Sequence, residues 1–210
     1  MDSITVSKVG DARKGSACSF RNVNGVDDQG DDVNMRAVWF PGMRCKFTNV
    51  YEPKLKLTLV PDGEVVAKTV EWDAALGKAV ASDARFPYKS IVTLDDTWGP
   101  KMEVVAYGDK LSVYDARGEG PPVKVPGTLE QRKAALKGMY LKIRADVSSL
   151  TQYSTNGGAS KLTIKVRVVV IEDPPEQEPE QEDDDLCGYT PTNKRGRDES
   201  TTSPSKRQCQ

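Results

Sequence analysis

Three segments of the chain place pairs of basic residues at every second position between apolar residues. Successive side chains of a β-strand point to opposite faces, so each segment should bury its apolar residues and present two bases on the other face. Like charges on neighbouring strands repel unless acids or a bound anion compensate them, so such a face could bind an anion. The pairs are Lys54 with Lys56, Lys142 with Arg144, and Lys165 with Arg167.

Aromatic residues accompany these bases and suggest which anion the face would bind. Lysine and arginine neutralise backbone phosphates while aromatic rings stack on bases, a combination typical of surfaces that bind single-stranded nucleic acid. Solvated sheet faces also carry lysines, which protect edges from aggregation, so this simpler interpretation stays open. Four other aromatic residues, Trp39, Phe40, Trp72 and Phe86, are expected in the core. The predicted nucleic-acid-binding residues are Lys54, Lys56, Tyr140, Lys142, Arg144, Tyr153, Lys165 and Arg167.

Residue types that most enzymes use are missing or badly spaced. The chain has no histidine, the commonest general base and metal ligand, and its four cysteines have no metal-ligand spacing. Asp95 and Asp96 are adjacent but have no further ligands nearby, which favours a turn. We therefore expect no enzyme, catalytic residue, metal or cofactor. Cysteine usage and the absence of a long apolar run indicate an intracellular protein without a membrane partner.

Short strands separated by turn residues predict a mainly β fold, either a barrel or a sandwich. Two helices are expected, at 71–84 and 128–137. The second has a capping box formed by Thr128 and Gln131, with Gly138 as the residue that ends it. The expected strands cover residues 4–9, 17–23, 36–40, 44–50, 54–60, 90–94, 103–107, 110–114, 139–147 and 162–171.

Charge is distributed unevenly and divides the chain. The total is −1, but residues 172–210 hold eleven acids and five bases, so the preceding body is mildly basic. We expect residues 1–34 to be an N-terminal extension with short strands, and 35–172 to be the barrel domain. Residues 173–193 should form a disordered acidic tail, because proline and charge prevent burial, and 194–210 a disordered basic segment.

The two parts of the tail suggest separate roles. An acidic tether beside a basic surface competes with polyanions for it, and could also recruit partner proteins. A solubilising role is the alternative. Two basic clusters eight residues apart fit a bipartite nuclear-import signal, with an import receptor as partner. The acidic residues are Glu176, Glu178, Glu180, Glu182, Asp183, Asp184 and Asp185, and the basic ones are Lys194, Arg195, Arg197, Lys206 and Arg207.

Several motifs resemble those of phage-type replicative single-stranded DNA-binding proteins and their relatives in large eukaryotic DNA viruses. They are EPKLKLTLVPD at 52–62, LSVYDARG at 111–118, PVKVPG at 122–127, KGMYLKIRADV at 137–147 and YSTNGGASKLTIKVRVVVIED at 153–173. The acidic tail is similar too, although here a basic segment follows it. The resemblance implies an OB-fold barrel that binds single-stranded DNA without sequence preference during replication, recombination or repair, in a nucleus if the import signal is used.

Two other functions remain open at this point. A nucleoplasmin-like histone chaperone also joins a β domain to an acidic tract and a bipartite basic signal, and would form a ring of subunits. A viral jelly-roll structural protein would fit the length and the number of strands. The sequence leaves open the oligomeric state and the choice between DNA and RNA.

Overall fold

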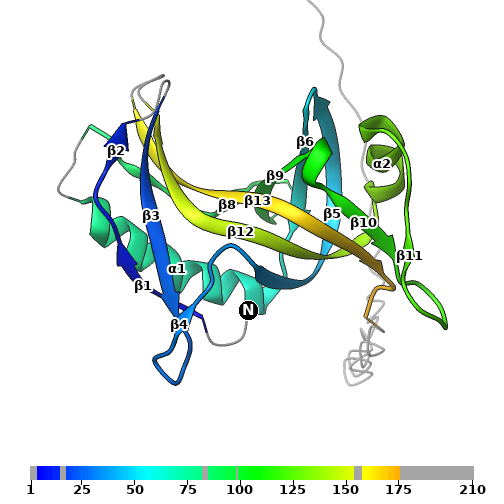
Figure 1. The fold of residues 1–210 in the computed structure, drawn as a ribbon, viewed down its shortest axis with the longest axis horizontal. Coiled ribbons are helices and arrows are strands. Elements are labelled where there is room, and N and C mark those ends of the chain that lie inside the picture. Colours follow the sequence, from blue (N-terminus) through cyan, green and yellow to red (C-terminus); the bar gives the residue numbers. More distant parts are fainter. Residues whose placement is uncertain (1–3, 15–17, 82–84, 98, 154–157, 176–210) are drawn as a thin grey trace, which may run out of the picture. The chain divides into compact units, whose positions relative to one another are not determined.

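The computed structural model describes residues 4–14, 18–81, 85–97, 99–153 and 158–175. Residues up to Pro175 belong to one compact unit (Figure 1). The predicted acidic residues at 176–185 and the predicted import signal at 194–207 lie outside the described residues, so these expectations stay predictions.

Five strands form a closed barrel. They are β5 (Val38–Tyr51), β6 (Lys54–Val60), β9 (Gly99–Tyr107), β12 (Tyr140–Tyr153) and β13 (Ala159–Glu172). Hydrogen-bonded neighbours run β5–β6–β9–β13–β12, and β12 pairs again with β5 to close the ring. Only the β9–β13 pair is parallel within this ring. This is the five-stranded Greek-key order of an OB fold, which confirms the predicted fold class. A jelly roll, the fold expected for a viral structural protein, would consist of two stacked sheets instead of one closed barrel.

Further strands extend the barrel sheet at two places. Strand β3 (Cys18–Val26) pairs with the second half of β12, beyond the part that pairs with β5. At the other side, β10 (Ser112–Asp115) lies parallel to the end of β13, and β11 (Val123–Lys124) pairs with β10. The remaining short elements are β1 (Thr5–Val9), β2 (Arg13–Lys14), β4 (Asp32–Val33), β7 (Tyr88–Lys89), β8 (Val92–Asp95) and the 3-10 turn η1 (Gly108–Lys110).

The barrel interior is filled by the apolar residues of the alternating segments. The three leucines of β6 are fully buried, as are Leu141 and Ile143 of β12. Helix α2 (Leu129–Leu136) packs against β5 and β6, and buries Leu129 and Leu136. Its capping box is present as predicted, and Gly138 has a φ of +82°, a conformation that glycine adopts without strain.

Helix α1 (Gly63–Val80) begins eight residues before the predicted start at residue 71. Asp62 caps it by accepting a 2.9 Å hydrogen bond from the Val65 amide, so the helix starts within the stretch between the expected strand at 54–60 and the expected helix at 71–84. Trp72 packs edge-on against Phe40 of β5, with ring centroids 6.2 Å apart, and its indole donates to the Ile4 carbonyl. The expected core positions of Phe40 and Trp72 are therefore confirmed.

Two irregularities change which residues face outward. Pro41 and Gly42 were expected to form a turn between two strands, but they lie within β5, where its pairing with β12 shifts register. A second shift in the β12–β13 pairing, around Arg167, reverses the alternation of β13. Val169 and Ile171 are consequently buried, while Val168 and Val170 face outward, contrary to the expected alternation.

Among the residues that the structure describes, no helix is long and apolar enough to cross a membrane. The same residues contain no group of three or more histidine, cysteine, aspartate or glutamate side chains that could hold a metal ion.

Candidate nucleic-acid interface

Outward-facing residues of β5, β12, β13, β10 and β11 form three rows across the sheet. Side chains in one row are direct neighbours because the strands pair in register, and the rows are two residues apart along β12, β13 and β10. The first row is Arg44, Tyr140 and Glu172; the second is Lys142, Val170, Tyr114 and Lys124; the third is Trp39, Arg144, Val168 and Ser112. We call this surface the β12 face.

Trp39 is the main aromatic residue of the β12 face. Its side chain is 40% exposed, so its expected place in the core was wrong. The Lys142 ammonium lies over the indole, 5.7 Å from the ring centroid. A cation in this position is attracted to the negative face of the ring. Trp39 and Lys142 therefore offer a stacking surface and a positive charge side by side.

Tyr140 is held against the backbone of β5. Its ring covers Gly42 so closely that a methyl group at this position would collide with the ring. Burial, together with the charges of Asp62 and Glu172, raises the pKa of Tyr140, so the hydroxyl stays protonated at neutral pH. The structure thus confirms that Tyr140 lies beside Lys142 and Arg144 on one face, but its ring is partly covered by packing.

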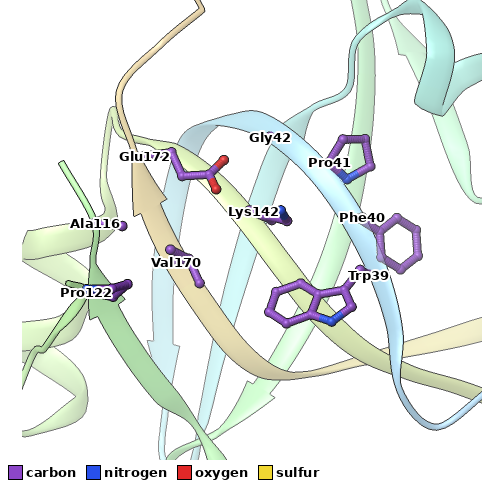
Figure 2. Close-up of a pocket in the computed structure, with 9 residues that line it drawn as sticks. All are labelled: Trp39, Phe40, Pro41, Gly42, Ala116, Pro122, Lys142, Val170 and Glu172. Atoms are coloured by element: carbon purple, nitrogen blue, oxygen red, sulfur yellow. The ribbon is translucent and has the colours of Figure 1, made fainter. Parts of the chain in front are cut away.

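A groove of about 650 Å³ opens on the β12 face. Figure 2 shows Trp39 at one end, Lys142 and Val170 in the middle, and Glu172 extending from β13 toward β5 at Gly42. Ala116 and Pro122, from the connection between β10 and β11, form the opposite wall. Apolar walls with one cation and one anion suit a flat heteroaromatic ring that carries polar edges and a phosphate.

The bases of the β12 face have no ion-pair partner among the residues that the structure describes. Within the described residues, neither Lys142 nor Arg144 forms an ion pair. Two bases held close together without compensating carboxylates favour binding of an anion from outside the chain.

The bases on the other side of the barrel are compensated. Lys56 contacts Glu103 at 2.7 Å, and Lys161 lies 3.7 Å from the same carboxylate. Burial acts to raise the pKa of Glu103, but the Lys56 hydrogen bond and the nearby lysine charges hold it below its usual range. Lys56 was a predicted binding residue, and the structure places it in this ion-pair cluster, away from the β12 face.

Lys165 and Arg167 were expected to lie near Lys142 and Arg144 across the β12–β13 pair. The pairing is confirmed, but Lys165 lies opposite Asp146, and Arg167 is 3.6 Å from the Asp146 carboxylate. Burial acts to raise the pKa of Asp146, but hydrogen bonds from Ser148 and the two basic charges lower it overall. Asp146 therefore compensates the second basic pair.

Two predicted residues lie elsewhere on the surface. Lys54 of β6 sits over Tyr107, 5.5 Å from the ring centroid, and pairs in register with Tyr51, whose side chain is 63% exposed. These three residues form a second, smaller aromatic and basic group. Tyr153 ends β12, thirteen residues from Tyr140, and is exposed there beside β3.

Eight of the eleven members of the β12 face were not among the predicted binding residues. Trp39 and Arg44 belong to a strand in which Pro41 and Gly42 suggested a turn. A regular alternation would have placed Val170 in the core, but the register shift turns it outward. Only the pairing register brings Tyr114 into the row of Lys142 and Glu172 into the row of Tyr140. Exposure of Trp39 had one signal in the sequence, its alternation with the apolar residues Val38 and Phe40.

Comparison with known proteins finds similarity in structure only. No protein-family model and no curated protein matches the sequence. A single-stranded DNA-binding protein from bacteriophage Enc34 is similar over 83% of this chain and 96% of its own, with 11% identity and a TM-score of 0.45. The single-stranded DNA-binding protein gp2.5 of bacteriophage T7 is similar over 74% of this chain and 100% of its own, with 17% identity and a TM-score of 0.36.

Proposed function

We propose that this protein binds single-stranded DNA without strong sequence preference and coats it during replication, recombination or repair. One observation carries the proposal: an exposed tryptophan lies under an uncompensated lysine at the end of a groove on an OB-fold barrel. OB folds commonly bind oligonucleotides on the face of their second and third strands, which are β6 and β9 here, and the groove lies on the adjoining strands β5, β12 and β13. No residue set for catalysis is needed for this function.

The mechanism combines stacking with phosphate neutralisation. A base that unstacks from the adjacent bases of the strand stacks on Trp39, while Lys142 and Arg144 neutralise the phosphates beside it. In a duplex the bases are stacked and paired, so the Trp39 surface is accessible only to a single strand. Every base has a π face, and the binding is therefore tolerant of sequence. Lys54, Tyr107 and Tyr51 offer a second contact for a longer strand.

The acidic residues at 176–185 extend the proposal to regulation. Tethered near a basic surface, they compete with weakly bound polyanions, and DNA that displaces them frees the tail for replication or recombination proteins. The basic residues at 194–207 would bind an import receptor and direct the protein to a nucleus.

Fluorescence anisotropy with a labelled oligo-dT and the full chain tests the binding. We expect salt-sensitive binding to the oligonucleotide that is tighter than to a duplex of the same length. Trp39→Ala should weaken it by about tenfold, because base–aromatic stacking contributes roughly 1–3 kcal/mol per base. Leu94→Ala is the matched control, since Leu94 is 85% exposed on β8 and lies outside the β12 face.

Three results would contradict the proposal. Equal affinity for duplex and single strand would leave the Trp39 surface without a role. Equal effects of Trp39→Ala and Leu94→Ala would place binding elsewhere on the molecule. Tight binding of core histones without any binding of the oligonucleotide would favour the chaperone function instead.

A further inference from the structure

Glu172 is the one carboxylate among the residues that line the groove on the β12 face. It lies in the same row as Tyr140 and Arg44, and one row away from Lys142 and Val170. No ion pair of Glu172 occurs within the described residues. Figure 2 shows its carboxylate over the groove, at the end opposite Trp39. A general phosphate-binding surface does not need this charge, which repels the backbone.

A carboxylate at this place can distinguish bases by their hydrogen-bonding edges. It accepts hydrogen bonds and cannot donate them when ionised. Guanine presents two adjacent donors, N1–H and the N2 amino group, which match the two oxygens of a carboxylate. Adenine and cytosine each present one amino group beside an acceptor nitrogen. Thymine presents its single N3–H between two carbonyl oxygens, which repel a carboxylate.

We propose that Glu172 gives the groove a preference for guanine at one position of the bound strand. The base stacks on the Trp39 side while its Watson–Crick edge donates to Glu172, and Val170 and Pro122 contact the rest of the ring. This inference rests on the proposed function, and it adds one selective position to a surface that otherwise tolerates any sequence.

The charges along the groove also orient the strand. Arg144 is in the third row with Trp39 and Lys142 is in the second, whereas Glu172 is in the first row. Phosphates are attracted to Lys142 and Arg144 in the second and third rows. Glu172 repels them from its side of the first row, where Tyr140 separates it from Arg44. A nucleotide is therefore bound with its phosphate at the Arg144 end and the edge of its base at the Glu172 end, which is the orientation that guanine recognition requires.

The test measures the affinity of the full chain for four oligo-dT probes at low salt. One probe is dT throughout, and the others carry a single central dG, dA or deoxyinosine. We expect dG to bind about five- to tenfold more tightly than dT, the lower end of the range for a bidentate base contact because the groove is open to water. Deoxyinosine keeps N1–H but lacks the N2 amino group, so it should lose most of this gain.

The dA probe separates recognition from stacking. A purine stacks better than a pyrimidine on any aromatic ring, so a gain shared by dG and dA would come from Trp39 alone. In that case the inference about Glu172 is wrong, although the groove still binds the base.

A variant assigns the preference to the carboxylate. Glu172→Gln keeps the shape of the side chain but can donate as well as accept, so the affinities for the dG and dA probes should become equal to within about twofold. Glu130→Gln on helix α2 makes the same charge change away from the groove and should keep the preference. A preference that survives Glu172→Gln would overturn the inference.

Loss of guanine recognition and loss of single-strand binding give different results in this experiment. If all four probes bind equally and Trp39→Ala weakens all of them, single-strand binding stands and guanine recognition is wrong. If none of the probes binds, the proposed function is wrong, and the inference with it.

Discussion

At the scale of single residues, the partner of each base decides its role. Six bases have the same position in an alternating strand, and the sequence gives no means to rank them. The structure separates them, because Glu103 and Asp146 compensate Lys56 and Arg167 while Lys142 and Arg144 have no acidic partner in the described part of the chain. These acids come from other strands or from a shifted register, so local sequence could not reveal them.

Gly42 offers a test of how the β12 face is built. A Cβ atom at this position would collide with the Tyr140 ring, so Gly42→Ala should displace the ring and lower the free energy of unfolding by about 1–3 kcal/mol, as overpacking does. Oligonucleotide binding should weaken as well, because Tyr140 is next to the groove. Chemical denaturation of the variant measures the first effect and anisotropy the second.

Gly63 is the matched control for this substitution. It is the first residue of α1, it has no neighbour within reach of an added methyl group, and alanine is compatible with its conformation. Gly63→Ala should leave stability unchanged or raise it by about 0.4–1 kcal/mol. Equal destabilisation by the two variants would show that the Tyr140 contact is not the cause.

At the scale of elements, the sequence predicts most strands but misses their irregularities. The alternation of 54–60 and 139–147 correctly identifies the buried residues of β6 and of the first half of β12. The same rule fails in β13 after Val166, because one extra residue at the register shift exchanges the two faces. A bulge depends on the pairing partner, and the sequence of one strand does not contain that information.

Two adjacent valines test the shifted register directly. Val169 is fully buried and Val170 lines the groove, so Val169→Ala should cost roughly 2 kcal/mol of unfolding free energy and Val170→Ala about 1 kcal/mol or less. Only Val170→Ala should alter oligonucleotide binding. The regular alternation expected from the sequence predicts the reverse order of stability, which thermal and urea unfolding would reveal.

At the scale of the whole molecule, the resemblance of a few motifs was enough to predict an OB-fold barrel. Alternation and turn residues alone left a barrel and a sandwich open. The ring order β5–β6–β9–β13–β12 follows from long-range pairing, which closes the barrel and brings residues 128 positions apart, Arg44 and Glu172, into one row. The grouping of the binding residues could not be predicted because it depends on this closure.

The acidic tail can be tested as a competitor of DNA. A chain that ends at Pro175 keeps the compact unit, including the hydrogen bond from the Gly118 amide to Asp173. Without residues 176–210 the affinity for oligo-dT at low salt should rise several-fold, and the difference should shrink as salt screens the tail. A full-length variant with neutral residues in place of the acids at 176–185 should behave like the truncated chain. Unchanged affinity in both would contradict the competition.

The salt dependence of oligo-dT binding tests the role of the β12 face most directly. The slope of log K against log salt concentration reports the number of phosphates neutralised, at about 0.7 per phosphate for a single strand. Replacing both Lys142 and Arg144 by glutamine should reduce the slope by about 1.4, whereas replacing Lys56 and Lys161, which already contact Glu103, should change it little. An equal reduction by the two pairs, or no reduction by the first, would contradict the assignment of the β12 face as the DNA-binding surface.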